Sequence, residues 1–255
     1  MNAAVRRSGQ GAPLVLLHGV GLDHRLWDDL APCLESDFEV LRYDLLGHGQ
    51  AAPLRAAVTP EDFAKQLDRV LDQAGWNDAH LLGYSMGGLI AAHYAATRAS
   101  RVQRLTLLST VYQRTEAEAT AVRARLDAST TQDAQASTAV SLARWFTPAY
   151  RETHETRVQE IGQRLLANDR DSFLHAYRMF VTGDRLIDTH AIRCPVLVMT
   201  GSDDVGSTPR MSETLAADLP RAQLQIVAGQ RHMLPVEAPA TVAQALRGFF
   251  LPAST

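Results

Sequence analysis

The chain of 255 residues has little cysteine, a single lysine and no long apolar run. Its two cysteines, Cys33 and Cys194, are too few for a disulfide-stapled scaffold or a thiolate zinc site. No segment approaches the roughly 20 apolar residues that a membrane-spanning helix requires. A signal peptide is not expected either, because the early apolar run over residues 12–17 is typical of a buried strand. We therefore expect a cytoplasmic protein with no membrane partner.

An excess of charge of either sign is also missing, since the formal net charge is −3. This balance gives no electrostatic reason to expect a nucleic acid or an anionic membrane as partner. A hydrophobic content of 46% with 21% charged residues excludes a disordered chain. The length allows one large α/β domain or two small ones, and these quantities do not indicate an oligomeric state.

Six short apolar runs, each typical of a parallel strand buried on both faces, alternate with helical patterns. The runs cover residues 14–17, 38–43, 80–84, 104–109, 195–200 and 222–227. A helix is predicted over residues 60–74, with Thr59 as its N-cap, Pro60 as its first residue and Gly75 after its end. Further helices are predicted over residues 86–98 and 238–250. The alternation predicts an α/β fold with a doubly wound, mostly parallel sheet.

Strand patterns stop between residues 112 and 189. The composition of this stretch is helical, with candidate helices over residues 116–126, 134–145, 155–167 and 172–180. Because the stretch lies between two strands of the sheet, we interpret it as an insertion and not as an independent domain. The predicted organisation is a core of residues 1–111 and 190–255 with a helical cap, or lid, of residues 112–189 inserted before the last two strands.

Residues 83–87 (GYSMG) directly follow a predicted strand and open a predicted helix. This is the G-x-S-x-G pattern of a nucleophile elbow, in which glycines flank a serine on a sharp turn between strand and helix. Ser85 then projects at the C-terminal end of the strand. The positive end of the helix lies beneath the negative charge that develops during attack. Ser85 is therefore the candidate nucleophile.

A serine hydroxyl is a weak nucleophile, so it needs a general base and an acid that orients that base. After an elbow of this kind the acid and then the histidine follow along the chain, on loops behind later strands. His232 is the one histidine of nine that lies just past a late strand. The loop after the preceding strand contains Asp203 and Asp204, and we expect only one of these two side chains to serve.

The first strong strand ends at residues 18–21 (HGVG), which we expect opposite the elbow. Here the chemistry requires backbone N–H groups, and those of Val20 and Met86 are predicted to form an oxyanion hole. A second glycine-rich turn (DLLGHG) lacks the lysine and the spacing of a phosphate loop. Its Asp44 and His48 are interpreted as structural residues that hold this loop beside the site.

Together the motifs LHG, DxxGHG, GYSMGG, GxxD and GxxH resemble the serine-hydrolase branch of the α/β-hydrolase fold superfamily along nearly the whole chain. The resemblance places the acid three residues after Gly201, which implies a triad of Ser85, Asp204 and His232. It implies no metal and no organic cofactor. It also implies two antiparallel strands at the start. Only about a dozen residues precede the LHG strand, so we expect the first strand to be missing and residues 3–7 to form at most an edge strand.

Within this superfamily the chain resembles the 3-oxoadipate enol-lactonases. The resemblance is carried by residues 144–148 (RWFTP), 176–180 (AYRMF) and 232–237 (HMLPVE). It implies a serine hydrolase that cleaves a small carboxylic ester or lactone, such as 3-oxoadipate enol-lactone, through an acyl-enzyme.

A carboxylated substrate of this kind requires a cationic anchor, for which Arg25, Arg144 and Arg178 are candidates. Apolar candidates for the substrate pocket are Leu22, Met86, Trp145, Phe146 and Met233. Packing within the cap or the core is the alternative interpretation of all these side chains.

Two other functions stay open from the sequence. An enzyme with the same triad would instead hydrolyse a C–C bond or a thioester, carry out perhydrolysis, or act as an acyltransferase. A receptor that kept the fold and the triad would bind a ligand and turn it over very slowly. A haloalkane dehalogenase or an epoxide hydrolase is disfavoured, because Ser85 stands where the elbow of such an enzyme needs an aspartate.

Overall fold

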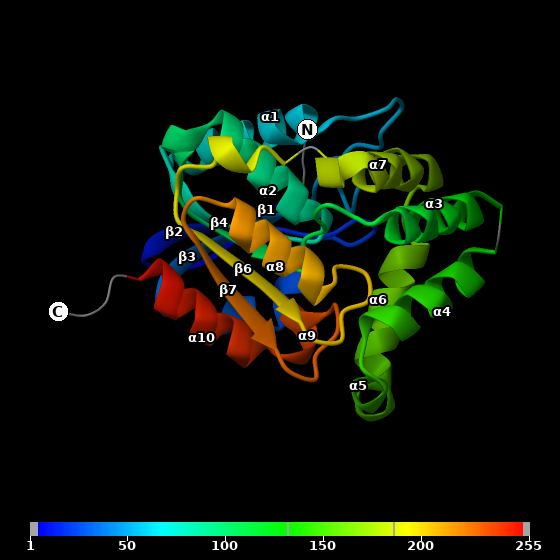
Figure 1. Cartoon of the computed structure of the whole chain (residues 1–255). Helices are drawn as coiled ribbons and strands as arrows, with labels where there is room; N and C mark the ends of the chain where they lie inside the picture. The colour runs from blue at the N-terminus through cyan, green and yellow to red at the C-terminus, as the bar shows by residue number, and fades with distance from the viewer. Residues whose placement is uncertain (1–4, 132, 186, 252–255) are drawn as a thin grey trace.

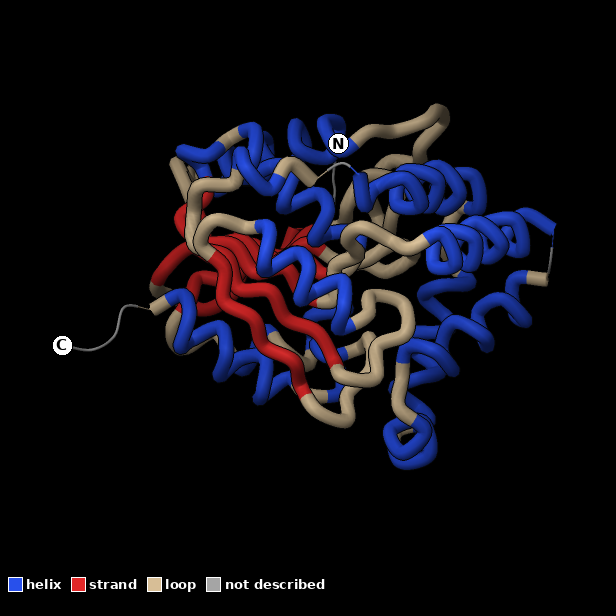
Figure 2. The backbone as a smooth tube through the Cα atoms, viewed as in Figure 1, coloured by secondary structure: helices blue, strands red, loops and turns tan. Residues whose placement is uncertain are grey.

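The computed structural model describes residues 5–131, 133–185 and 187–251, and its centre is a seven-stranded sheet (Figure 2). The strands lie in the order β1-β3-β2-β4-β5-β6-β7, and every neighbouring pair is parallel except β1 and β3. Their bounds are β1 Val5–Gly9, β2 Ala12–Leu17, β3 Phe38–Tyr43, β4 Ala79–Tyr84, β5 Val102–Leu108, β6 Val196–Gly201 and β7 Ala222–Val227. All six predicted strands are present, and the expected doubly wound, mostly parallel fold is confirmed.

The N-terminal edge strand ends two residues later than expected. β1 runs to Gly9, antiparallel to β3, and residues 3 and 4 of the prediction lie outside the described part of the chain. In the described ranges β1 is the one strand ahead of β2, which agrees with the expected loss of the first strand.

Helices cover both faces of the sheet and create two apolar cores (Figure 1). Along β2, Val15 and Leu17 belong to the core that contains α1, α2 and α8, whereas Leu14 and Leu16 belong to the core that contains α10. All four side chains are fully buried, as expected for a central parallel strand. The helix bounds are α1 Pro60–Ala74, α2 Met86–Thr97, α8 Pro209–Asp218, α9 Leu234–Glu237 and α10 Pro239–Phe250.

The ends of α1 follow from local sequence. The backbone N–H of Thr59 donates to the Asp62 carboxylate at 2.9 Å, and Pro60 starts the helix without losing a hydrogen bond. Gly75 ends it in the left-handed conformation, with φ 75°. The predicted bounds of this helix are confirmed.

Five helices are inserted between β5 and β6, beyond the arrowheads of β6 and β7 in Figure 1. They are α3 Glu116–Thr131, α4 Ala134–Trp145, α5 Pro148–Thr153, α6 Glu155–Leu166 and α7 Arg170–Thr182. Four of them match the predicted helices. The short α5, which Thr147 caps at its N-terminus, was not predicted, and neither were α8 and α9. Short 3₁₀ turns occupy His24–Asp28, Ala31–Cys33, Ala99–Arg101, Gly183–Arg185 and Thr189–Ala191.

Polar contacts fasten the inserted helices to the segment after β7. The backbone N–H and the hydroxyl of Thr147 donate to the Glu237 carboxylate at 3.0 and 2.7 Å. The Arg231 guanidinium donates to the carbonyl of Ala143 at 2.8 Å. The junction of α4 and α5 is therefore held beside the loop that contains His232.

A buried histidine on β4 is expected to make the fold sensitive to acid. The His80 ring stacks on Phe250 at 4.7 Å, and burial together with the charge of Arg104 lowers its pKa from 6.5 to about 4. The unfolded chain takes up the proton first, so stability is lost as the pH falls from 6.5 towards 4. His80→Phe keeps the ring and removes the titration. In urea unfolding between pH 7 and 4.5, we expect the variant to lose less stability than the wild type, by at most about 3 kcal/mol.

The matched control is His190→Gln, which removes a histidine at the exposed surface in place of a buried one. Equal pH slopes for His80→Phe and the wild type would show that His80 does not contribute to the acid sensitivity.

Candidate active site

Ser85 lies on a strained turn between β4 and α2. Its φ and ψ are 54° and −115°, a conformation that residues other than glycine rarely adopt, and its N–H donates to the carbonyl of Leu108 at 2.9 Å. A Cβ on Gly83 would overlap the carbonyl oxygen of Gly87 and lie 2.6 Å from Cα of Gly88. The glycine that precedes the serine by two positions is therefore required by close backbone packing.

Asp204 and His232 form a buried hydrogen-bonded pair. The loops after β6 and β7 bring His232 Nδ1 to 2.7 Å from Asp204 Oδ2, and the two residues are 7% and 2% exposed. The other carboxylate oxygen, Oδ1, accepts the N–H groups of Gly206 and Ser207 at 2.8 and 2.9 Å. Burial opposes ionisation, but His232 and these N–H groups lower the pKa of Asp204 below its ordinary value. The pair consists of a fixed carboxylate and an oriented imidazole.

The carboxylate of Asp203 does not share the environment of its neighbour Asp204. Asp203 is exposed and accepts the hydroxyl of Ser202 at 2.7 Å. Of the two acids that the sequence offers, the structure therefore brings only Asp204 to the histidine.

Aromatic rings flank the imidazole of His232. The ring of Tyr84 lies 5.1 Å from it and that of Trp145 lies 6.1 Å from it, measured between centroids. Ser85 and His232 line the same pocket, although no hydrogen bond joins the two side chains among the described residues. Such bonds are often long before substrate binds, so this geometry is compatible with a nucleophile and its base.

The HGVG turn lies against Ser85. A Cβ on Gly19 would be 3.4 Å from Cβ of Ser85 and 3.0 Å from the Tyr84 ring. His18 fixes this turn, because its Nε2 accepts the N–H of Leu45 at 2.9 Å and its Nδ1 therefore donates to the carbonyl of Gly19 at 2.8 Å. Burial lowers the pKa of His18, which keeps the ring neutral. The N–H of Met86 is free of the helix ladder, because Met86 is the first residue of α2.

The second glycine-rich turn is held by Asp44. This carboxylate accepts the ring N–H of His24 at 2.7 Å and the N–H of Gln50 at 2.8 Å. Although burial opposes ionisation, these bonds lower the pKa of Asp44 to about 2. Ligand atoms of Asp23, His24 and Asp44 lie within 4.8 Å of one another, the spacing of a metal site. Asp23, however, pairs with the Arg25 guanidinium at 2.5 Å, and the cluster is explained as a loop anchor.

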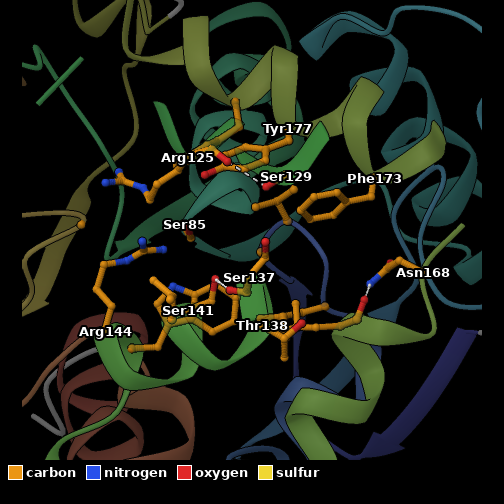
Figure 3. A pocket seen from close by; sticks show the side chains of 18 of the residues that line it. Ser85, Arg125, Ser129, Ser137, Thr138, Ser141, Arg144, Asn168, Phe173 and Tyr177 are labelled. Carbon is orange, nitrogen blue, oxygen red and sulfur yellow. Dashed lines mark hydrogen bonds between the residues drawn. The ribbon is translucent and has the colours of Figure 1, made fainter. Parts of the chain in front are cut away.

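Ser85 and His232 open into a cavity of about 280 Å³, the active-site pocket (Figure 3). Its walls combine aromatic side chains with hydroxyl groups from the inserted helices. Four arginines line it: Arg114, Arg125, Arg144 and Arg170. No described aspartate or glutamate does, so the pocket is strongly cationic.

Three of the predicted pocket residues line this cavity: Leu22, Arg144 and Trp145. Val20, which was predicted for the oxyanion hole, lines it as well. The prediction is wrong for Phe146 and Met233, which are fully buried in the core that contains α10. It is also wrong for the side chain of Met86, which is fully buried in the core on the opposite face of the sheet. Phe146 stacks on Tyr150 with centroids 5.4 Å apart. The sulfur of Met233 accepts the Tyr84 hydroxyl at 3.1 Å.

Two of the three predicted anchor arginines are also outside the pocket. Arg25 pairs with Asp23 and lines a separate hollow beside Arg164. Arg178 is exposed on α7, although its neighbour Tyr177 lines the pocket, because successive helical residues point about 100° apart. Arg144 is the one member of the predicted trio in the pocket.

Sequence reasoning missed the pocket residues of α3 and α7. Arg125 belongs to α3, whose residues show no clear apolar face. The sequence therefore did not indicate that the Arg125 side chain faces the pocket. On α7 a usable signal existed: Phe173, Tyr177 and Phe180 recur at the spacing i, i+4, i+7 of one helix face, and all three line the pocket.

Comparison with known proteins finds hydrolases similar to this chain over nearly its whole length. A family model described as alpha/beta hydrolase fold matches residues 12–160, more than half of the chain. The chain is 31% identical to the (E)-2-((N-methylformamido)methylene)succinate hydrolase of Acinetobacter baylyi over 243 residues, which cover 94% of this chain and 91% of that protein. It is 26% identical to the 3-oxoadipate enol-lactonase 1 of the same organism, over 94% of this chain and 89% of the relative.

Solved structures agree with the fold. A hydrolase from Pseudomonas aeruginosa PA01 superimposes with a TM-score of 0.89 and 27% identity, over 97% of this chain and 94% of that one. The enol-lactonase from Burkholderia xenovorans LB400 gives a TM-score of 0.90 at 24% identity, over 98% of both chains. No helix within the described ranges is long and apolar enough to cross a membrane.

Proposed function

Because the chain belongs to the α/β-hydrolase fold family, we propose that it is a serine hydrolase that cleaves a small carboxylic ester or lactone carrying a carboxylate. One observation carries the proposal: an elbow serine and a carboxylate-oriented histidine open into the same pocket, which four arginines line. The serine and histidine suit acyl transfer, and the arginines suit an anion.

In the proposed mechanism Ser85 attacks the substrate carbonyl while His232 takes up the hydroxyl proton. Asp204 holds the Nδ1–H tautomer and stabilises the imidazolium that forms. The oxyanion accepts hydrogen bonds from the N–H groups of Val20 and Met86, which cost no reorganisation because the turn and the helix are already in place.

His232 then protonates the leaving oxygen, and the acyl-enzyme forms. The same imidazole removes a proton from water, and the tetrahedral intermediate collapses to release the acid and Ser85. In a lactone the leaving hydroxyl stays attached to the acyl group, so the pocket has to hold it away from the ester until water attacks.

The inserted helices are proposed to act as a cap, residues 112–189, over a core of residues 1–111 and 190–255. The triad residues come from loops of the core, whereas the four arginines all come from the inserted segment. This division supports a core that supplies the chemistry and a cap that selects the substrate.

The names of relatives support a small carboxylated substrate. One relative is a hydrolase of a methylene succinate and another is a 3-oxoadipate enol-lactonase. We propose Arg144 as the anchor of one substrate carboxylate, because it lines the pocket at the end of α4 beside Trp145.

Arg144→Gln is expected to raise KM about 10–100-fold for a carboxylated ester and to leave kcat nearly unchanged. The matched substrates are mono-4-nitrophenyl glutarate and the neutral 4-nitrophenyl valerate, which share a five-carbon acyl chain. KM for the neutral ester should stay as in the wild type. Arg178→Gln, on the exposed face of α7, is the control. Equal effects on both esters would remove Arg144 as anchor.

A panel of substrates tests the reaction class. Wild type and Ser85→Ala are compared on 3-oxoadipate enol-lactone, simple γ- and δ-lactones and a short-chain 4-nitrophenyl ester. A much higher kcat/KM for the enol-lactone supports the lactonase, and reaction of the activated ester alone supports an esterase with another substrate. Turnover of only a few per hour, with tight retention of the ligand, would instead favour a receptor.

A further inference from the structure

The four arginines of the active-site pocket fall into two pairs by their contacts. Arg114 lies over the Phe180 ring at 4.9 Å and donates to the carbonyl of Val181 at 3.1 Å. Arg170 donates to the carbonyl of Thr130 at 2.6 Å. Among the described residues, neither Arg125 nor Arg144 forms a hydrogen bond or an ion pair, although the charge of Asp204 attracts Arg144 without direct contact. Two guanidinium groups of the pocket are therefore uncompensated by a direct partner.

This arrangement is unfavourable for the free protein. Arg125 is half-buried, and its Nε is buried without a partner. Burial of Arg144 and then the positive charge of Arg125 lower the pKa of Arg144. Charges taken out of water without a partner destabilise a fold, and here two like charges are also close enough to repel. Unpaired charges of this kind are common in binding sites whose ligand carries the opposite charge.

Both guanidinium groups lie on one side of Ser85 (Figure 3). Arg125 extends from α3 and Arg144 from α4, while Phe173 lies on the opposite side of the view. The pocket thus has a cationic side and a side that contains Phe173, with Ser85 between them.

We propose that the substrate carries two carboxylates on the same side of the scissile bond, one bound by Arg125 and the other by Arg144. A monoanion neutralises only one of the two uncompensated charges, whereas a dianion neutralises both. Each planar guanidinium can donate two parallel hydrogen bonds to a carboxylate, which suits recognition of two separate groups. The inference rests on the proposed function for its scissile bond, but its binding step is independent of turnover.

The test measures binding to the full-length Ser85→Ala variant by calorimetry. The probes are malonate, succinate, glutarate and adipate, each compared with the monocarboxylate of equal carbon number. At least one diacid is expected to bind 10-fold tighter or more than its monoacid partner. If no diacid binds more than about 3-fold tighter than its monoacid, the two-carboxylate pocket is wrong. Wild-type esterase assays are run separately, so a failure of hydrolysis is distinguished from a failure of dianion binding.

Arg125→Leu and Arg144→Leu separate recognition from a structural role. Each should reduce the advantage of the diacid over its monoacid to less than about 3-fold, because the one guanidinium that remains can bind only one carboxylate. Without ligand, each should raise Tm by about 2–4 °C, because an uncompensated charge is removed. Arg178→Gln is the control, and it should change neither the diacid advantage nor Tm. A lower Tm with the diacid advantage intact would overturn the assignment of that arginine.

Discussion

Replacing Ser85 with alanine is expected to lower kcat about 10⁴- to 10⁶-fold for every ester or lactone that the wild type cleaves. The hydroxyl is the one group at the elbow that can form the acyl-enzyme, and alanine tolerates the turn no worse than serine does. The remaining rate reflects the oxyanion hole and substrate binding alone. Steady-state rates measure the loss, and mass spectrometry of the wild type during turnover of a slow ester should detect the acyl group on residue 85.

The control for this prediction is Ser36→Ala, which removes an exposed hydroxyl that donates to Asp37 at 2.7 Å. It should keep the wild-type rate. Substrate affinity of Ser85→Ala, measured by calorimetry, should stay within about 10-fold of the wild-type KM, since the pocket arginines are untouched. A variant with tight binding and more than a tenth of the wild-type rate would exclude Ser85 as the nucleophile.

The candidate catalytic centre was largely predictable because its signals are local. The sharp turn at Ser85 requires glycine at position 83 for close backbone packing, so the motif itself records the geometry. His232 follows a strand whose apolar run ends a few residues earlier, and parallel strands bring their C-terminal ends to one edge of the sheet. Alternation along β2, with Val15 and Leu14 in opposite cores, likewise comes directly from the sequence.

The pocket was much less predictable because its walls come from tertiary packing. Whether Arg144 or Arg178 faces the cavity depends on how α4 and α7 are rotated against the core. α4 carries no strong apolar stripe that would fix this rotation from sequence, whereas the aromatic residues of α7 mark the face that meets the pocket. Arg25 follows Asp23 by two residues and pairs with it, so a local ion pair decides its place.

The reacting groups were easier to predict than the pocket walls because the former lie on the core and the latter on the inserted helices. Strained turns and hydrogen bonds such as that between Asp204 and His232 hold the reacting groups on the core, where small displacements cost rate. The inserted helices are joined to the core by polar contacts such as that of Thr147 with Glu237, and they supply the four arginines of the pocket. If the proposed function holds, substitutions in α3, α4 or α7 would therefore change the substrate without disturbing the proposed catalytic groups.

Asp204→Asn is expected to lower kcat about 10⁴-fold while the fold stays intact. Oδ1 of Asp204 accepts two backbone N–H groups, so the carbonyl oxygen of asparagine takes this position and its NH₂ takes the position of Oδ2. That NH₂ donates to His232 Nδ1, which must then be the acceptor nitrogen. The ring proton moves to Nε2, and an Nε2–H cannot take up the proton of Ser85.

The measurement is the pH–rate profile of Asp204→Asn beside that of Asp203→Asn. The second variant neutralises the exposed neighbour and should retain the wild-type rate, because that carboxylate contacts Ser202 and not the histidine. At high pH, hydroxide competes for the proton of Ser85, so the loss for Asp204→Asn should shrink as the pH rises, whereas a structural defect would lower the rate equally at every pH. A large loss for Asp203→Asn with an active Asp204→Asn would assign the acid to the other residue, against the 2.7 Å contact between Asp204 and His232.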